Sequence, residues 1–383
     1  MSESYDLPLD PLADELDAYI ESHELSARGR TLDREPAFPR REFESMGAAG
    51  WLGLTTPTAF GGRGLSIART GVLLHRLAFR TGTTFAKLSL QPEFASVLRE
   101  VGSEVLVDTW FRPLVAGRRL VGNQITEAIA GSDAQALQLE ARREPTGYSL
   151  SGEKTEVAFA TEADAAIVYG RVEGGTSDGV TAFLVPQEGS GILRQVVGTD
   201  LGERWQRRGS VTYRRVRVPL ESRLGEEGEG FSYVRAELTR ERALLAAVYL
   251  GVARASWVDT VAHVGRRIAF GRPLSANQAV AFPLVDDEGD LAAAWLYVRQ
   301  VLERLDRAEE VDAEAALAKS IATRVALVAL DRAIQFHGGR GYSNELPFEQ
   351  RWRDVRSGSI AHGSSEIMHL VAARRLWPRR PAS

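Results

Sequence analysis

The spacing of apolar residues changes twice along the chain and divides it into three regions. Up to about residue 120, apolar positions follow helical spacing; in the segment 10–24, for example, an apolar residue recurs at every fourth position. From about 122 to 220, short runs of alternating apolar and polar residues, bounded by turn residues, predict β-strands. After Gly230, helical spacing returns over longer segments.

Three apolar stripes in the last region are typical of helices that pack against one another. The middle stripe advances in alternating steps of four and three, which is the spacing found in four-helix bundles. We expect Asp312 to cap the start of the last of these helices, and Gly338 and Gly339 to end it. The stripes consist of Ala246, Leu250, Ala253, Trp257, Val261 and Val264; of Leu291, Trp295, Val298, Leu302 and Leu305; and of Leu317, Ile321, Val325 and Val328.

This order of regions predicts three domains and an α+β fold class. We expect a helical domain over residues 1–121, a compact antiparallel barrel or sandwich over 122–230, and a helical bundle over 231–383. The chain has 383 residues, which is enough for each domain to have a core of its own.

The composition excludes several classes of function. The chain has 47 basic and 51 acidic residues, and this net charge of −4 argues against a protein that binds nucleic acid through phosphate contacts. The absence of cysteine excludes disulfides, thiolate metal sites and a cysteine nucleophile. The six histidines lack metal-binding spacing, so we expect no bound metal.

The sequence also lacks the features of membrane and secreted proteins. It contains no run of about 18 apolar residues, and its acidic N-terminal segment has neither the basic nor the apolar region of a signal peptide. We therefore expect a cytoplasmic protein that does not associate with a membrane. Only three basic residues are lysines (Lys87, Lys154 and Lys319), which we interpret as the codon bias of a GC-rich genome.

Two glycine-rich tetrads, at residues 61–64 and 338–341, have the sequence Gly-Gly-Arg-Gly. A dinucleotide-binding loop requires a strand before the glycines and a helix after them, inside a βαβ unit. Neither tetrad has that context, because the first lies among turn residues and the second follows a predicted helix. Both are therefore predicted to be turns.

Six segments together make the chain similar to the acyl-CoA dehydrogenase superfamily of flavoproteins. The most specific is the C-terminal block 335–376, while 125–133 resembles the family's flavin-binding motif Thr-Glu-Pro-x-Ala-Gly-Ser-Asp. The resemblance implies the family's fold, which has an N-terminal helical domain, a central antiparallel β-barrel and a C-terminal four-helix bundle. The other segments are 38–66, 150–154, 216–231 and 267–280.

The resemblance also implies FAD as the cofactor, held between the β-domain, the bundle and a neighbouring subunit of a homodimer or homotetramer. Arginine on a diphosphate and an aromatic ring on adenine agree with charge-assisted bonding and stacking. The matching positions are Thr126 and Ser132 for the flavin and pyrophosphate, Arg267, Phe270, Gln278, Gln335 and Gly339 on the partner side, and Ser364 and Glu366 near the adenosine.

The reaction end departs from the family pattern. Glu156 replaces a tryptophan that contacts the flavin ring, and Ala158 replaces the hydroxyl residue that bonds flavin N5. His362 stands where many members have the glutamate that removes the α-proton of the thioester, and Ala361 replaces an aromatic residue, which should widen the substrate cavity. Arg242 matches an arginine close to that base, and its charge would lower the pKa of His362.

Three interpretations of this altered end stay open. In the first, a dehydrogenase uses neutral His362 as the base, although this histidine could equally be a filler of the site. In the second, the chain is a flavin monooxygenase. In the third, His362 and Glu156 are the acid–base pair of a non-redox cyclase or isomerase of a polyketide-like substrate, with the flavin structural or absent. A binding protein without activity belongs beside the third.

We favour an FAD-dependent oxidoreductase that acts on an acyl thioester or an acyl-derived intermediate in bacterial specialised metabolism, such as polyketide or antibiotic biosynthesis. Its expected catalytic residues are His362, Glu156 and Arg242, with Glu156 lining the flavin cavity at a raised pKa. Its expected partners are the acyl substrate on CoA or on an acyl carrier protein, and an electron-transfer protein.

Overall fold

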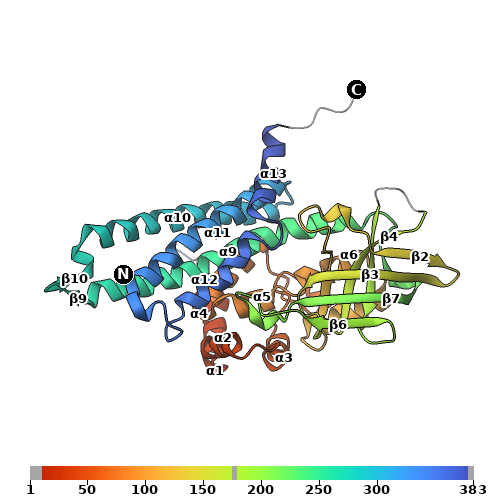
Figure 1. Ribbon diagram of the computed structural model, residues 1–383, viewed down its shortest axis with the longest axis horizontal. Helices are drawn as coiled ribbons and strands as arrows, with labels where there is room; N and C mark the ends of the chain where they lie inside the picture. Colours follow the sequence, from red (N-terminus) through yellow and green to blue (C-terminus); the bar gives the residue numbers. More distant parts are fainter. Residues whose placement is uncertain (1–10, 175–178, 378–383) are drawn as a thin grey trace.

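Helices form both ends of the chain and a sheet lies between them (Figure 1). The computed structural model describes residues 11–174 and 179–377. The N-terminal region is helical, as the apolar spacing predicted. Its helices are α1 (Pro11–Ser22), α2 (Leu25–Arg34), α3 (Arg40–Ala48), α4 (Ile67–Thr81), α5 (Thr83–Ser89), α6 (Ser96–Val101), α7 (Glu104–Leu106) and α8 (Arg112–Val115), with a 3₁₀ turn at Glu93–Ala95.

An eight-stranded sheet forms the central region. A separate apolar cluster of its own strand residues gives this region its own core. The strands lie in the order β6-β7-β3-β2-β4-β5-β8, with β1 also paired to β4. They are β1 (Val121–Gln124), β2 (Glu140–Glu144), β3 (Gly147–Val157), β4 (Ala165–Val172), β5 (Val180–Pro186), β6 (Ile192–Val196), β7 (Gly209–Pro219) and β8 (Arg223–Leu224).

The strand pairing is less uniform than the fully antiparallel arrangement that we expected. β1 and β2 both pair with β4 in parallel, whereas the other neighbouring strands are antiparallel. Parallel pairs need a long connection, and the β2–β3 hairpin supplies it between β1 and β4. Within the described residues, β6 and β8 are edge strands that do not pair with each other, so the sheet is not closed by hydrogen bonds.

Three long helices dominate the C-terminal region, and two short ones pack on α11 (Figure 1). A small hairpin of β9 (Ile268–Ala269) and β10 (Arg272–Pro273) joins the first two long helices. The three long helices pack against one another, and α12 and α13 add to this bundle through α11. The helices are α9 (Gly230–Arg266), α10 (Gln278–Asp306), α11 (Asp312–His337), α12 (Phe348–Arg356) and α13 (Ser365–Leu376).

Helix α9 is the central element, because it contacts α4, α10 and α11. By length and composition it could cross a membrane, since its most apolar window has a mean hydropathy of 1.3. However, 78% of that window is buried inside the protein. Its apolar residues are therefore accounted for by the core.

Of the two predictions for the ends of α11, the one for its start is wrong and the one for its end is confirmed. Asp312 is the first helical residue and not the cap, and its carboxylate accepts a hydrogen bond from the hydroxyl of Thr239 on α9 at 2.5 Å. Gly338 ends the helix with a φ of 60°, a conformation that favours glycine. The other tetrad also forms a turn, in which Gly61 has a φ of 91°.

Candidate active site

His362 lies in the turn that leads into α13. Its φ is 55°, and the φ of Gly363 is 95°, so two successive residues adopt the left-handed conformation. A side chain at Gly363 would crowd Arg242 and the core beneath it, which explains the glycine. The Nζ of Lys319, on α11, donates hydrogen bonds to the carbonyl oxygens of Ala361 at 2.5 Å and Gly363 at 2.6 Å. The buried side chain of Lys319 therefore fixes this turn through two hydrogen bonds.

A buried carboxylate of α9 lies against this histidine. The Oε2 atom of Glu241 is 3.6 Å from Nε2 of His362, and Glu241 is almost completely buried. The ring of Phe94 covers the imidazole at 5.4 Å between centroids, and Nε of Arg242 donates to the carbonyl oxygen of His362 at 3.1 Å. The other ring nitrogen, Nδ1, has no hydrogen-bond partner in the part of the chain that the structure describes.

The surroundings move the pKa values of this pair in opposite directions. Burial, followed by the charges of Lys319, Lys87 and Arg242, lowers the pKa of His362 well below its ordinary value. Burial and the neighbouring Glu93 raise the pKa of Glu241 to about 8. At neutral pH, the imidazole is therefore uncharged, while Glu241 holds the proton that the pair retains. A divergence of this kind is typical of residues that perform acid–base chemistry.

The structure places Glu156 differently from our expectation. A bulge in β3, where the register against β7 shifts between Lys154 and Val157, gives Glu156 a φ of 57°. Its side chain is 62% exposed, and its carboxylate accepts a hydrogen bond from Arg208 at 2.7 Å. The expectation of a carboxylate withdrawn from solvent is thus corrected, because the bulge turns the side chain outward. The acidic residue beside His362 is therefore Glu241 and not Glu156.

The loop after β1 carries two of the predicted cofactor residues and is held by a buried ion pair. Nζ of Lys154 donates to the carboxylate of Glu127 at 2.8 Å, and burial lowers the pKa of this lysine to about 8. The carboxylate also accepts two backbone N–H bonds from residues 138 and 139. Thr126 is half-buried and Ser132 is exposed, so both hydroxyls lie where they could bind a phosphate or a ring edge.

The predicted partner-side residues lie together at the opposite end of the bundle. Phe270 is completely exposed at the tip of the β9–β10 hairpin, which Figure 1 places at the end farthest from the sheet. The stacked rings of His263 and His337, 4.2 Å apart, bring the ends of α9 and α11 side by side there. The predicted cofactor residues at this end, all of them exposed, are Arg267, Phe270, Gln278, Gln335 and Gly339.

The two sets of residues fit FAD only in part within one chain. A hydroxyl-bearing loop lies at the sheet, and an arginine and an exposed aromatic ring lie at the far end of the bundle. Ser364 and Glu366 lie at the start of α13, where the Ser364 hydroxyl accepts a hydrogen bond from the N–H of Ile367 as the helix cap. Ala158, half-buried and packed against the large apolar core, offers no hydroxyl to the flavin. The arrangement therefore fits a cofactor that spans two copies.

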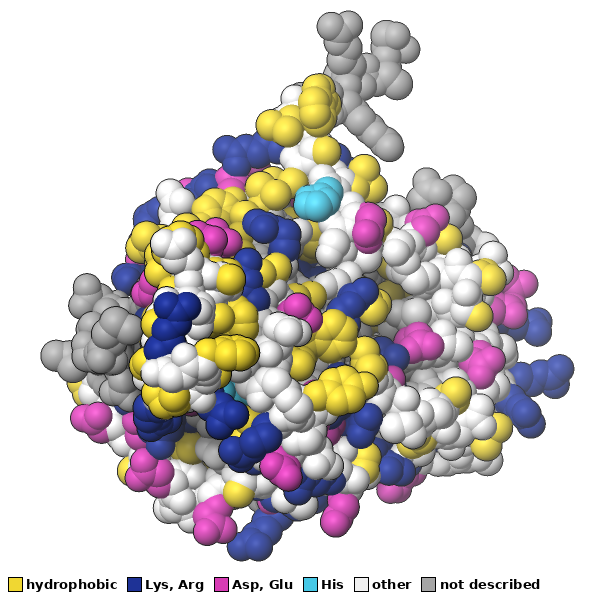
Figure 2. All heavy atoms as spheres, turned by 60° about the vertical axis from the view of Figure 1, so that its left-hand side comes forward, with side chains coloured by type: hydrophobic (Ala, Val, Ile, Leu, Met, Phe, Trp, Pro, Cys, Tyr) yellow, Lys and Arg dark blue, Asp and Glu magenta, His cyan; other side chains and the backbone are white. Residues whose placement is uncertain are grey.

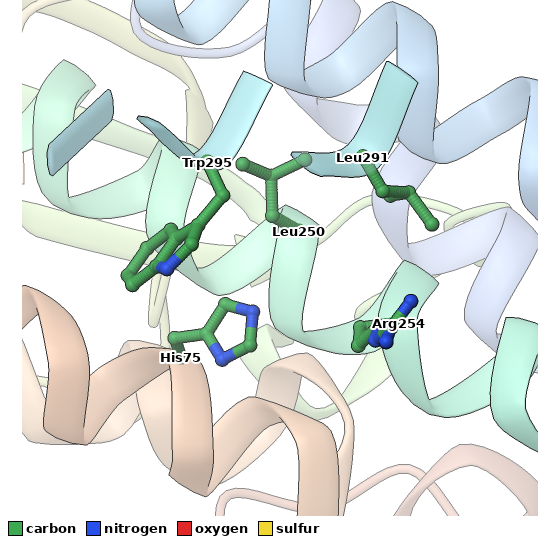
Figure 3. Close-up of a pocket in the computed structure, with 5 residues that line it drawn as sticks. All are labelled: His75, Leu250, Arg254, Leu291 and Trp295. Carbon is green, nitrogen blue, oxygen red and sulfur yellow. The ribbon is translucent and has the colours of Figure 1, made fainter. Parts of the chain in front are cut away.

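A second buried histidine lies in a small pocket between α4, α9 and α10 (Figure 3). His75 tilts against the ring of Trp295 at 4.5 Å between centroids, with Leu250, Arg254 and Leu291 around them. Burial, followed by the charge of Arg254, lowers the pKa of His75 to about 3. No carboxylate lines this pocket, so its histidine lacks the acid partner that His362 has.

Sequence reasoning missed Glu241 and Lys319, although both left a signal. Glu241 directly precedes Arg242, and it is a charged residue at the start of a long apolar stretch. Lys319 stands among small apolar residues of α11, with Ala315, Ala316, Ala318 and Ala322 close to it in the sequence. A charged residue inside an apolar helical stripe indicates a buried ionic contact, because burying an unpaired charge is costly.

Known proteins resemble this chain over its whole described length. Family profiles for the N-terminal, middle and C-terminal domains of acyl-CoA dehydrogenase match residues 12–118, 122–216 and 228–377. The human mitochondrial short-chain specific acyl-CoA dehydrogenase is 31% identical over 347 residues, which is 90% of this chain and 84% of that protein. A probable acyl-CoA dehydrogenase of Bacillus subtilis (strain 168) is 31% identical over 357 residues, or 92% and 94% of the two chains. The structure of butyryl-CoA dehydrogenase from Megasphaera elsdenii matches with a TM-score of 0.90 at 26% identity, covering 97% of this chain and 99% of that one.

Proposed function

This chain belongs to the acyl-CoA dehydrogenase family, and on that premise we propose that it oxidises an acyl thioester with Glu241 and His362 as its base. Family membership confirms the fold class inferred from the sequence and makes the protein an FAD-dependent oxidoreductase. When bound, FAD accepts a hydride from the β-carbon of the acyl group. The residues of this chain must therefore remove the α-proton.

The observation that carries this proposal is the 3.6 Å contact between Glu241 and His362. Removal of the α-proton leaves an electron pair that forms the α,β double bond as the hydride departs. A neutral imidazole or an ionised Glu241 can take that proton, and a small shift of either side chain from the 3.6 Å separation would bring the two into hydrogen-bond distance. Arg242 and Lys319 fix the turn through its carbonyl oxygens, so they act as positioning residues.

The altered reaction end points to a substrate of specialised metabolism. In the resemblance to the family, Ala361 stands in the place of an aromatic residue, and the charges of Lys319, Lys87 and Arg242 act on His362. A pocket of this kind suits a polar acyl group better than a fatty-acid chain. CoA and an acyl carrier protein stay as alternative carriers of the substrate. We also predict that the enzyme is cytoplasmic and is reoxidised by an electron-transfer protein.

A second copy of the chain is part of the proposal, because the predicted FAD contacts divide between two distant ends. Figure 2 shows apolar side chains interspersed with arginines on the bundle face that is turned forward. Exposed apolar residues of this region include Phe270, Phe282, Val285 and Leu296. Association would bury this surface and bring the hairpin of one copy to the flavin loop of the other.

The direct test is anaerobic reduction of the purified flavoprotein by thioesters. We expect FAD to co-purify and the flavin absorbance to bleach on addition of a short-chain acyl thioester, with the α,β-unsaturated product formed. Bleaching that a His362→Ala, Glu241→Gln double variant retains would contradict the assigned base. Rearranged product without bleaching would favour the non-redox isomerase, and turnover that requires O₂ would favour the monooxygenase.

A further inference from the structure

A second acid lies one helical turn before Glu241 on α9. Glu237 is four residues earlier, so both side chains project from the same face of the helix. Both are almost completely buried. Burial raises the pKa of Glu237 well above its ordinary value, and the neighbouring Glu241 adds to the effect. Two buried carboxyl groups on one face call for a group that compensates them.

Three polar atoms around Glu237 make no conventional hydrogen bond to the rest of the described chain, although the Tyr169 hydroxyl and the Asn123 side chain interact with each other. They are Oε1 of Glu237, Oδ1 of Asn123 and the hydroxyl of Tyr169. Nδ2 of Asn123 lies 3.5 Å from the other oxygen of Glu237, and Asn123 pairs with Ile167 in the β1–β4 register. Tyr169, two residues further along β4, therefore projects from the same face of the sheet. Its side chain is completely buried, and the charges of Glu237 and Glu241 contribute to its raised pKa.

Arg240, an arginine close to Glu237, directs its hydrogen bonds to other residues. Arg240 donates to Glu93 at 3.4 Å, to the hydroxyl of Ser96 at 2.7 Å and to Glu100 at 2.8 Å. Asn123 donates its amide to the carbonyl oxygen of Phe94 at 3.2 Å, which leaves its own oxygen facing the cluster. The cluster thus has three potential acceptors and no cation hydrogen-bonded to Glu237. A buried acceptor left unpaired costs about 1–3 kcal/mol.

We infer that Glu237, Asn123 and Tyr169 bind a protonated amine on the acyl group of the substrate. An ammonium group has three donors and no acceptor, which matches the three oxygen atoms around this site, and its charge would favour the ionised form of Glu237 on binding. The Cβ atoms of Glu237 and Glu241 are about 5–6 Å apart, as for any such helical pair. An amine three bonds beyond the α-carbon extends over most of that distance toward the Glu237 carboxyl group. This inference rests on the proposed function, and it specifies an aminoacyl thioester as the substrate class.

The test compares two thioesters of equal length on the same pantetheine carrier. In 4-aminobutyryl-pantetheine, an ammonium group replaces the terminal methyl group of pentanoyl-pantetheine. We expect the amine to reduce the flavin with a kcat/KM at least about tenfold higher, because buried polar groups reject an analogue that leaves them unpaired. Equal or faster reduction by pentanoyl-pantetheine would overturn the inference and leave the proposed function intact. Equal reduction by 4-hydroxybutyryl-pantetheine would overturn the requirement for a charge.

Two variants assign the preference to these residues. Glu237→Gln keeps the shape of the side chain and should bring the ratio between the two thioesters close to one, while the pentanoyl rate is retained. Tyr169→Phe should lower the ratio by a smaller factor. An unchanged ratio in Glu237→Gln would exclude this residue from recognition.

Binding gives a readout that does not depend on turnover. The same thioesters are added to the enzyme and the rise in Tm is measured. A larger rise in Tm with the amine, lost in Glu237→Gln, supports the inference. This holds even where no thioester bleaches the flavin, and that absence of bleaching is the result that contradicts the proposed function. No difference between the thioesters in Tm would overturn the inference.

Discussion

The two ends of this molecule differ in how complete they are within one chain. Around His362, each charged side chain has its neighbours in the same chain, from α9, α11 and the turn before α13. At the β9–β10 hairpin, by contrast, Phe270 is completely exposed and touches nothing that would explain an aromatic residue there. The first end is a buried site, and we propose that the second is one half of an interface. Reaction chemistry should therefore respond to changes within one chain, and cofactor affinity to changes across two.

The largest effect is expected at the buried end. Glu241→Gln keeps the volume of the side chain but removes the ionisable group beside His362. We expect the rate constant of flavin reduction to fall about 10²–10⁴-fold with unchanged FAD content, because a positioned base contributes that much. His362→Ala should have an effect of similar size. Glu309→Gln, at a solvent-exposed glutamate, is the control, and an equal loss there would remove the distinction.

The pH dependence of the rate sharpens the assignment. A base works in its deprotonated form, so activity should increase with pH and level off above a pKa of about 8 where Glu241 is the group that takes the α-proton. Where His362 takes it, the rate should not change over this range, because the imidazole is already neutral. The pKa of His362 is lowered by burial and its cationic neighbours, so its protonation falls below this range. Below the midpoint, kcat/KM should change about tenfold per pH unit. A flat profile between pH 6 and 9 would contradict Glu241 as the group that titrates, and Glu241→Gln should abolish the dependence.

Stability should respond to the lysine beneath the turn. Lys319→Met leaves the carbonyl oxygens of Ala361 and Gly363 without their donor. We expect the free energy of unfolding, measured with urea, to fall by about 2–3 kcal/mol. Lys319→Arg should not restore it, since a planar guanidinium is larger than the buried ammonium site. Arg324→Met, at an exposed position of the same helix, should change stability by less than about 0.5 kcal/mol.

The exposed end should affect cofactor binding and not the chemical step. Phe270→Ala is expected to weaken FAD binding about fivefold, as the loss of one aromatic stacking contact does. Fluorescence titration of the apoprotein with FAD measures this, and the rate of flavin reduction at saturating FAD should stay the same. Leu193→Ala, at an exposed apolar residue of β6, is the matched control. A loss of chemical rate with full FAD occupancy would contradict the division between the two ends.

Glu156 should give the smallest effect. Its carboxylate is more than half exposed and pairs with Arg208 at the surface, and such pairs contribute about 0–1 kcal/mol. Glu156→Gln should therefore change the rate of flavin reduction less than about threefold. A loss of 100-fold or more would restore Glu156 to the catalytic machinery, through a second copy that covers it.

The three lysines show where the interpretation of composition was incomplete. Lys87, Lys154 and Lys319 are 3%, 0% and 1% exposed, so every lysine of the chain is buried, whereas the basic residues of the surface are arginines. Codon bias accounts for the arginines but not for the positions of the lysines. Lys154 and Lys319 each direct a compact ammonium group to two acceptors in the interior, which a guanidinium would not fit.

The sequence by itself determined the order of helices and strands, the two glycine turns and the family. These depend on local spacing and on motifs that are read without knowing which segments meet. It also singled out His362 and Arg242 as candidate site residues, because both lie inside or beside such motifs.

Only the tertiary structure decided which acidic residue lies beside His362. Glu241 and His362 are 121 positions apart in the chain, and they meet because the turn before α13 folds onto α9. Glu156 looked equivalent in the sequence, but a single bulge in β3 turns it to the surface. The pKa values of the pair likewise come from burial and from charges on three other elements. Those contacts have no local signature, because long-range packing creates them.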